Sequence, residues 1–315
     1  MQAYQPTIID YSPAHKEEWD AFVDRALNTS ILYRRDYMDY HSNRFTDASY
    51  MVYLYDKLVA LLPGHKTETT WSSHLGLTYG GLVVDTRMRY PVMTAIVREV
   101  ISLSRKRHYR KLIFKNQLEC YHRYLDSSWE YTLRAEGFQQ TRQEFNPVID
   151  LGIEVPISKT KEGHKRNQQT DFELAPGHLQ RYWENVLCPQ LESRYNTRPV
   201  HSYKEIKQLA AAFPDQIKLW CVHRNERILA GVLIFECGQV ARIQYAAQTG
   251  DGMRVNAMDY VYLSVIAQYR ERGFRFIDMG IVNDGEDHHV NQGLLDYKRS
   301  FGAAPHIQRR FELSL

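Results

Sequence analysis

Two adjacent glycines, Gly80 and Gly81, interrupt an apolar stretch of the sequence that runs from residue 77 to residue 84 (LTYGGLVV). Glycine weakens a strand, and paired glycines often mark a place where a ligand or a second backbone approaches closely. With Tyr79 and His74 beside them, these glycines predict a patch that contacts a ligand. The alternative is a bulge or a strand end, with Tyr79 packed in the core.

A second group of reactive side chains lies between Asn283 and His289 (NDGEDHH), where carboxylates and imidazoles gather. The segment lacks the D-x-[DN]-x-[DN]-G order of an EF-hand and has no spaced partner motif, so we expect a polar loop and no metal. A histidine or carboxylate there can still act through water as a general base. The sequence shows no convincing G-x-S-x-G elbow or Cys/His pairing, so a covalent nucleophile is not expected.

The cysteines are too scattered for a zinc site or a disulfide framework: they stand at positions 120, 188, 221 and 237. Reduced thiols of this kind are typical of a cytoplasmic protein. The N-terminal residues have neither the basic start nor the apolar core of a secretory signal. No apolar run approaches the ~20 residues that span a bilayer. The sequence therefore predicts a cytoplasmic protein with no transmembrane segment.

The composition indicates an ordered protein with two cores. A chain of 315 residues exceeds the size at which single cores stop growing, and its 12% aromatic residues can bury more apolar area than a disordered chain would. The 40 Lys and Arg residues against 37 Asp and Glu residues leave a formal charge of +3. This charge is too small to indicate a dedicated DNA-binding protein or a polybasic membrane anchor.

Two halves of the sequence have the same order of predicted elements. A β-hairpin is expected over residues 49–62 and again over 217–235, because apolar and polar residues alternate around a polar turn. A third extended stretch follows in each half, then an amphipathic helix, a strand, a short helix and a final strand. The expected ranges are 77–84, 91–101, 111–115, 127–137 and 144–151 in the first half, and 240–247, 256–273, 274–279, 294–301 and 307–313 in the second.

The long helix of the second half has the clearest pattern, with apolar residues in the i, i+3, i+4, i+7 spacing from Met258 to Tyr269. Asn256 is expected to cap its start and Gly273 to end it. The polar segment 157–170 has no apolar periodicity and marks the domain boundary, and a pair of helices is expected from 178 to 213. An internal duplication explains this order, with an N-terminal unit of residues 1–154 and a C-terminal unit of residues 155–315.

This order of elements resembles the core of the GNAT acyltransferases. The short helices end at Gly137-Phe138 and at Phe301-Gly302, which is similar to the F-Y-E-K-x-G-F ending of a GNAT unit. Two such units in tandem resemble the FemAB-like acyltransferases, and the most specific piece is NQGLLDYKRSFG from residue 291 to residue 302. The resemblance implies an α+β fold of two GNAT-like units, each a mixed twisted sheet flanked by helices.

The resemblance also implies transfer of an acyl group from acyl-CoA or aminoacyl-tRNA to an amine of a cell-envelope precursor. Lys298 stands where the GNAT motif has its tyrosine, facing the leaving group, and its ammonium can stabilise the oxyanion or leaving atom. Spacing alone favours the alternative, a solvated lysine in a last helical turn, and the resemblance favours the catalytic role. The matching residue of the first half is Leu133, so we expect the N-terminal unit to bind the acceptor.

The segment 248–256 occupies the place of the GNAT pyrophosphate loop, where backbone N–H groups and a helix start receive phosphate. Asp251 and Asp259 depart from that pattern because they bring negative charge toward an anion. The alternative is a glycine-rich turn before a capped helix. The expected donor-binding residues are Gln248, Gly250, Gly252, Arg254 and Asn256.

Further candidates stand at the ends of predicted strands. Tyr245 and Asp278 are base or positioning candidates, with core roles as the alternative. Lys115 and Asn116 follow the fourth strand of the first half and can hold a phosphate or a sugar hydroxyl, although exposed residues at strand ends are commonly inert. Together with His74, Tyr79, Gly80 and Gly81, they form the expected acceptor site.

The sequence thus predicts an N-acyltransferase that moves an acyl group, acetyl by preference, from acyl-CoA to an amino group of an amino sugar or an envelope-polysaccharide precursor. The expected acceptor is a small molecule or a lipid-linked glycan, and acetyl-CoA is the co-substrate. One alternative is aminoacyl transfer from tRNA to a peptidoglycan-type precursor, although no long coiled-coil arm for tRNA is visible. The other is a binding module for a glycan or nucleotide sugar, because fold does not fix function.

Overall fold

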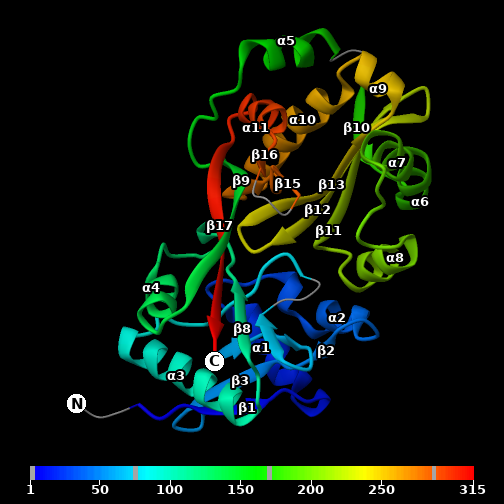
Figure 1. Ribbon diagram of the computed structural model, residues 1–315. Helices are drawn as coiled ribbons and strands as arrows, with labels where there is room; N and C mark the ends of the chain where they lie inside the picture. The colour runs from blue at the N-terminus through cyan, green and yellow to red at the C-terminus, as the bar shows by residue number, and fades with distance from the viewer. Residues whose placement is uncertain (1–3, 74–76, 169–171, 286–288) are drawn as a thin grey trace. The chain divides into compact units, whose positions relative to one another are not determined.

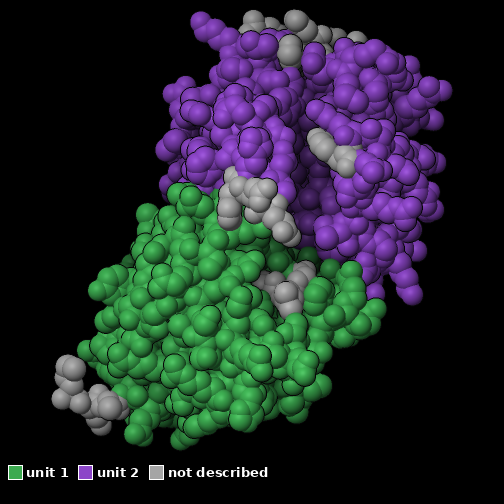
Figure 2. Space-filling model, viewed as in Figure 1, with its two compact units in different colours: residues 1–144, 307–315 green, residues 145–306 purple. Residues whose placement is uncertain are grey.

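The computed structural model describes residues 4–73, 77–168, 172–285 and 289–315. These residues form two compact units, one of residues 1–144 with 307–315 and one of residues 145–306 (Figure 2). The sequence placed the boundary at residue 154. The difference arises because β9 (Gln139–Asp150) and β17 (Ala304–Ser314) each contribute residues to both units. Alternation of side chains predicts a strand but does not tell which sheet the strand joins.

Unit 1 consists of residues 1–144 and 307–315 and contains two groups of strands (Figure 1). One group has the order β1-β3-β4-β7 and the other β17-β8-β6-β5-β2. Their bounds are β1 (Thr7–Asp10), β2 (Thr46–Asp47), β3 (Tyr50–Leu54), β4 (Lys57–Leu62), β5 (His65–Lys66), β6 (Thr70–Ser73), β7 (Val83–Val84) and β8 (Lys111–Lys115). The helices are α1 (Lys16–Arg25), α2 (Arg35–Met38), α3 (Tyr90–Lys106) and α4 (Ser128–Ala135).

The predicted hairpin of unit 1 is confirmed by β3 and β4, which pair from Tyr50↔Leu62 to Leu54↔Lys57. The extended stretch expected over 77–84 is shorter than predicted, because only β7 is a strand there. Gly80 instead makes an isolated parallel bridge to Asn116. The apolar stripe of α3 is buried against the aromatic residues Trp71 and Phe114 of the strands. Each large apolar side chain buried in this way contributes about 1.5–3 kcal/mol to folding.

Unit 2 consists of residues 145–306, and its strands follow the order β10-β11-β12-β13-β14, with the last part of β9 beside β14 (Figure 1). The strands are β10 (Glu173–Pro176), β11 (Ile217–Arg224), β12 (Arg227–Cys237), β13 (Val240–Gln248) and β14 (Phe276–Asp278), with a small hairpin of β15 (Asn283–Asp284) and β16 (His289–Val290). The helices are α5 (Lys159–Gln168), α6 (Leu179–Tyr182), α7 (Cys188–Tyr195), α8 (Tyr203–Ala212), α9 (Gly250–Arg254), α10 (Ala257–Glu271) and α11 (Gln292–Arg299).

The amphipathic stripe of α10 is confirmed: Met258, Val261, Val265 and Tyr269 are buried in the core of unit 2. The helix ends before Gly273, whose φ is +80°. Its start differs from the prediction. Asn256 is the residue before the helix, but its φ is +53° and its side chain makes no capping hydrogen bond. Asn256 instead forms a left-handed turn between α9 and α10, and this backbone differs from the extended one of an ordinary N-cap.

The segment read from the sequence as a polar boundary forms α5. An ion pair, rather than an apolar stripe, connects this helix to α10: Lys161 Nζ lies 2.9 and 3.0 Å from the carboxylate oxygens of Asp259. Apolar periodicity cannot detect a helix held in this way. Among the described residues, no helix combines the length and hydropathy that crossing a membrane requires.

The closing strand of each half pairs with the fourth strand of the other half. Ile149 of β9 pairs with Ile277 of β14, and Phe311 of β17 pairs with Phe114 of β8. This exchange explains why the two units share β9 and β17. Candidate residues follow β8 and β14 directly. Because of the exchange, each of these segments lies next to a strand from the other repeat.

Candidate active site

Lys298 lies on α11 with its ammonium buried in unit 2, not in solvent. The residue is 6% exposed, and Nζ donates hydrogen bonds to the carbonyl oxygens of Gly280 at 2.8 Å and Ile281 at 3.2 Å. An ammonium has three N–H donors. The described residues supply acceptors for two of them, so the third is available to a ligand. Burial lowers the pKa of Lys298 to about 8, although nearby Asp278 acts in the opposite direction.

The ammonium lies where two parallel strands stop pairing. β13 and β14 pair only from Val240↔Phe276 to Arg242↔Asp278. Directly afterwards, Gly280 has a φ of +76°, and a Cβ at that position would lie 3.8 Å from the carbonyl oxygen of Ile243 and 4.0 Å from Lys298 Nζ. Lys298 therefore stands close to both strands at the point where their backbone groups become available to a ligand.

A β-bulge in β13 adds to this opening. Leu233 of β12 pairs with Tyr245 and Ile234 pairs with Ile243, so Gln244 is the extra residue. A bulge leaves the backbone groups of the extra residue outside the regular ladder and re-aims its side chain. The region around Lys298 thus combines a buried cation with irregular backbone on both adjacent strands.

Asp278 is fully buried and engaged on both carboxylate oxygens. Oδ2 accepts a hydrogen bond from Arg242 at 2.5 Å, and Oδ1 accepts one from the backbone N–H of Gly280 at 2.8 Å. This ion pair fixes the turn whose carbonyl groups bind Lys298. The arrangement favours a positioning role for Asp278 over that of a general base.

Tyr245 has a partner that the sequence did not indicate. Its Oη lies 2.6 Å from Nδ1 of His201 and accepts a hydrogen bond from the backbone N–H of His201 at 3.2 Å. The Tyr245 hydroxyl is therefore held by both the backbone and the imidazole of His201. Both residues are buried. His201 belongs to the helical insertion, 44 residues away along the chain, so no local pattern could have found it.

The predicted donor loop contains one glycine that the packing requires and one that it does not. A Cβ at Gly252 would lie 2.3 Å from the carbonyl oxygen of Leu229, whereas a Cβ at Gly250 would meet only a side-chain atom of Arg254 at 4.0 Å. Thr249 caps α9, because its Oγ1 accepts the N–H of Gly252 at 3.0 Å. The loop is therefore held tightly against the β11–β12 hairpin.

The other end of the loop is fixed by Gln248, whose backbone N–H donates to the side chain of Gln190 at 2.7 Å. Within the described residues, the buried side-chain oxygen of Gln248 has no hydrogen-bond partner. A buried acceptor of this kind is costly unless a ligand or water completes it.

The acidic residues that departed from the loop pattern are neutralised. Asp251 forms an ion pair with Arg254, and Asp259 is held by Lys161 and by the hydroxyl of Tyr297 at 2.8 Å. A pocket of about 530 Å³ lies beside the loop, and its described lining contains Arg224, Arg227 and Arg254 together with Asp251. Guanidinium groups suit phosphate oxygens. No local pattern indicated Arg224 and Arg227, because they lie on a hairpin turn some 25 residues before the loop.

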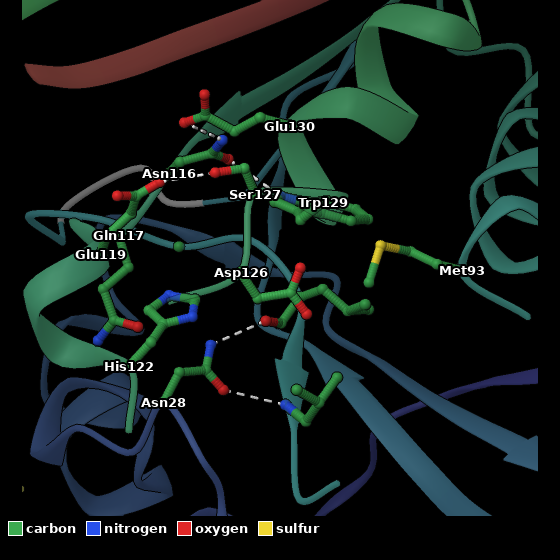
Figure 3. Close-up of a pocket in the computed structure, with 13 residues that line it drawn as sticks. Asn28, Met93, Asn116, Gln117, Glu119, His122, Asp126, Ser127, Trp129 and Glu130 are labelled. Carbon is green, nitrogen blue, oxygen red and sulfur yellow. Dashed lines mark hydrogen bonds between the residues drawn. The ribbon is translucent and has the colours of Figure 1, made fainter. Parts of the chain in front are cut away.

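Two of the residues expected to bind the acceptor line a pocket in unit 1. Gly80 and Asn116 belong to its wall, and Trp129 and Glu130 of α4 complete this part (Figure 3). Asn116 accepts a hydrogen bond from Trp129 Nε1 at 3.1 Å and donates one to Glu130 at 3.2 Å. Gly81 has a φ of +100°, and a Cβ there would lie 3.2 Å from Trp129 Nε1. Because Gly81 has no side chain, the backbone of the paired glycines can lie close to the indole of Trp129.

The remaining acceptor candidates are dispersed. Tyr79 is 1% exposed and packs against Tyr121 in the core, with its Oη 2.9 Å from Ser30 Oγ. Lys115 forms an ion pair with buried Glu144 at 3.0 Å and lines a separate basic pocket. His74 lies outside the described residues. Tyr79 therefore supports the glycines from the core side, as the alternative interpretation anticipated.

Residues 161–299 match the family model described as an acetyltransferase (GNAT) domain. The fold is similar to that of FemX, with a TM-score of 0.71 at 11% identity over 98% of this chain and 97% of that chain. It is also similar to L-PGS from Bacillus licheniformis, with a TM-score of 0.61 at 11% identity over 95% of this chain and 91% of that chain. A search of curated protein sequences found no significant match.

A tandem GNAT protein from the clavulanic acid biosynthesis pathway is similar over 98% of both chains, with a TM-score of 0.56 at 12% identity. These findings confirm the predicted α+β fold of two GNAT-like units and the prediction of an acyltransferase. The matched residues include the predicted donor loop, α10 and Lys298. Residues 161–299 therefore belong to the GNAT acetyltransferase domain family, and the whole chain has a fold similar to those of FemX and of a tandem GNAT protein.

Proposed function

We propose that the protein transfers an acyl group, acetyl by preference, from acyl-CoA to an amino group of an amino sugar or cell-envelope precursor. The observation that carries this proposal is the buried ammonium of Lys298 at the point where β13 and β14 part. In unit 2, the basic pocket beside residues 248–256 suits the phosphate groups of the donor. In unit 1, the pocket that contains Gly80 and Asn116 is the proposed acceptor site.

In the proposed reaction, a neutral amine attacks the thioester carbonyl, a C–N bond forms, and the C–S bond breaks. Negative charge develops first on the carbonyl oxygen and then on the sulfur, and the Lys298 ammonium stabilises it. The amine loses one proton and the leaving thiolate gains one, so the products are an N-acyl amine and free coenzyme A. Asp278 and Tyr245 position the strands around this centre through Arg242 and His201.

The test is thiol release by the purified full-length protein. Acetyl-CoA is incubated with glucosamine and a panel of other amines, and free thiol is measured against time. We expect release that requires both an amine and the protein. Absence of turnover with every donor and amine, together with measurable glycan binding, would identify a binding module instead.

The rate is expected to fall as the pH rises through about 8, where Lys298 loses its proton. Deprotonation removes the charge that stabilises the transition state, so kcat at saturating amine declines on the basic side. The Lys298→Arg variant keeps its charge throughout this range, since a guanidinium does not titrate there. Any activity that it retains should therefore lack this decline. The same decline in both enzymes would assign it to another group.

Aminoacyl transfer from tRNA is the second candidate. It is favoured by a likeness in fold to the C-terminal domain of a putative lysylphosphatidylglycerol synthetase from Agrobacterium fabrum. The TM-score is 0.60 at 12% identity, over 96% of this chain and 92% of that chain. This function requires tRNA binding that weakens steeply with salt, as phosphate contacts do. Binding assays with bulk tRNA between low and moderate salt check it. A lack of binding at low salt would eliminate this candidate.

A further inference from the structure

The pocket of unit 1 lies among elements that correspond in order to those around Lys298 in unit 2. In the first repeat, α3, β8 and α4 follow one another as α10, β14 and α11 do in the second. The pocket is lined by Met93 of α3, by residues directly after β8 and by the first turn of α4 (Figure 3). Leu133, the counterpart of Lys298, is fully buried and carries no charge. The first repeat therefore has a pocket but no counterpart of the Lys298 ammonium in the second repeat.

The charges that line this pocket are negative. Glu119, Asp126 and Glu130 belong to the lining, and no described lining residue is a lysine or an arginine. Burial holds the pKa of His122 below its ordinary value, although Glu119 and Asp126 act in the opposite direction. The imidazole is then uncharged at neutral pH. Such a pocket repels the phosphates of an acyl-CoA and attracts a cation.

The three carboxylates are not equivalent. Glu130 already forms an ion pair with Arg309 at 3.2 Å. Glu119 accepts a hydrogen bond from the Ser127 hydroxyl at 2.9 Å, and Asp126 accepts one from a backbone N–H at 2.8 Å. Glu119 and Asp126 are exposed, and within the described part of the chain neither has a cationic partner, so both are available to pair with a cationic ligand.

The buried side chain of Gln117 is an independent sign of a ligand. Gln117 is 7% exposed and lines the pocket, yet neither its amide nitrogen nor its amide oxygen has a hydrogen-bond partner among the described residues. Leaving such a buried group unsatisfied costs about 1–3 kcal/mol, and native proteins rarely do so. The Gln117 amide offers an NH₂ donor group and a carbonyl acceptor, which match the polar groups of a peptide bond or a hydroxyl.

The size and the walls of the pocket limit what can enter. Its cavity volume is about 60 Å³, which is room for about four water-sized groups. This space suits the end of a short methylene chain, and the rest of an acceptor would lie outside it. The apolar part of the wall is formed by Leu82, Val84, Met93 and Trp129. Figure 3 shows Met93 on one side of this space and Glu119, Gln117 and His122 on the other.

We propose that this pocket binds a protonated aminoalkyl group, such as the side chain of a lysine residue. Its methylene groups contact Met93 and Trp129, its ammonium lies between Glu119 and Asp126, and a neighbouring amide of the ligand completes Gln117. An ammonium held by carboxylates stays protonated, so this amine is an anchor and not the nucleophile. The statement that this anchor is part of the acyl acceptor rests on the proposed function. The binding of an aminoalkyl group to the pocket does not.

The experiment measures binding of Nα-acetyl-lysine methylamide to the full-length protein by calorimetry, without acyl-CoA. The matched control ligand is Nα-acetyl-norleucine methylamide, which has a similar chain and no ammonium. We expect the lysine derivative to bind at least about 10-fold more tightly, a ratio that corresponds to about 1.4 kcal/mol. Equal affinities for the two ligands, or no binding of either, would overturn the proposal.

Three variants locate the site. The double variant Glu119→Gln, Asp126→Asn should weaken binding of the lysine derivative about 10-fold or more, whereas Glu68→Gln, an exposed carboxylate outside the pocket, should not. Gln117→Leu should raise the melting temperature, because it removes an unsatisfied buried amide, and weaken binding at the same time. Equal affinity in the double variant and the Glu68→Gln control would place the ligand elsewhere.

The outcome is separable from that of the proposed function. Thiol release without binding of the lysine derivative would refute the pocket assignment alone. Binding without thiol release for any amine would support the pocket and refute the acyltransferase reaction.

Discussion

Replacement of Lys298 by alanine is expected to lower kcat by about 10²–10³-fold, the loss typical of one donor that stabilises an oxyanion. The effect is large because the ammonium acts from a buried site, where water screens little of its charge. Lys298 is 6% exposed, and two backbone carbonyl groups fix its position. Steady-state thiol release with acetyl-CoA and the best amine of the panel measures the change.

The matched control is Arg299→Ala, which removes an exposed cation from the adjacent position of α11. This variant should retain nearly full activity, because an exposed charge is screened by solvent. A melting temperature close to that of the wild type shows that Lys298→Ala is folded. A folded Lys298→Ala enzyme with full turnover would make Lys298 a structural residue.

Substitution of Gly252 by alanine is expected to raise the KM for acetyl-CoA at least about 10-fold, which corresponds to about 1.4 kcal/mol of donor binding. The added methyl group would lie 2.3 Å from the carbonyl oxygen of Leu229, so the loop must move away from the β11–β12 hairpin. That hairpin carries Arg224 and Arg227 of the basic pocket, and the movement would disrupt the proposed phosphate site. Initial rates at varied acetyl-CoA concentration measure the effect.

Gly250→Ala is the comparison in the same loop. Its methyl group would enter open space and meet only an atom of Arg254 at 4.0 Å, so the KM should rise less than in Gly252→Ala. The contrast between the two substitutions tests the position of the loop and not merely its composition. Equal KM values for both variants would show that the loop does not contact the donor.

The sequence was most informative where a local pattern determines the structure. The stripe of α10 and the hairpin turns follow from side-chain periodicity, and these elements are confirmed. Gly302 made Lys298 identifiable, because a helix that ends at a left-handed glycine fixes the register of the residues before it. The burial of Lys298 was not predictable from that register, since a lysine in a last turn is ordinarily solvated.

The missed features depend on contacts between distant segments. His201 meets Tyr245 only after the insertion has folded against β13, and Lys161 anchors α5 through an ion pair that leaves no apolar trace in the sequence. The exchange of β9 and β17 was hidden because their alternation suits either sheet. Gln117 was overlooked because a single glutamine after a strand carries no pattern.

Single-turnover thioester cleavage tests the role of Lys298 most directly. The wild type and Lys298→Ala, each in excess over acetyl-CoA, are mixed with saturating amine, and free thiol is followed by rapid quench while acetyl-CoA binding is measured separately. The proposal predicts an unchanged dissociation constant and a cleavage step slower by about 10²–10³-fold. Weaker binding with an unchanged cleavage rate would contradict it, because Lys298 would then hold the donor and not the transition state.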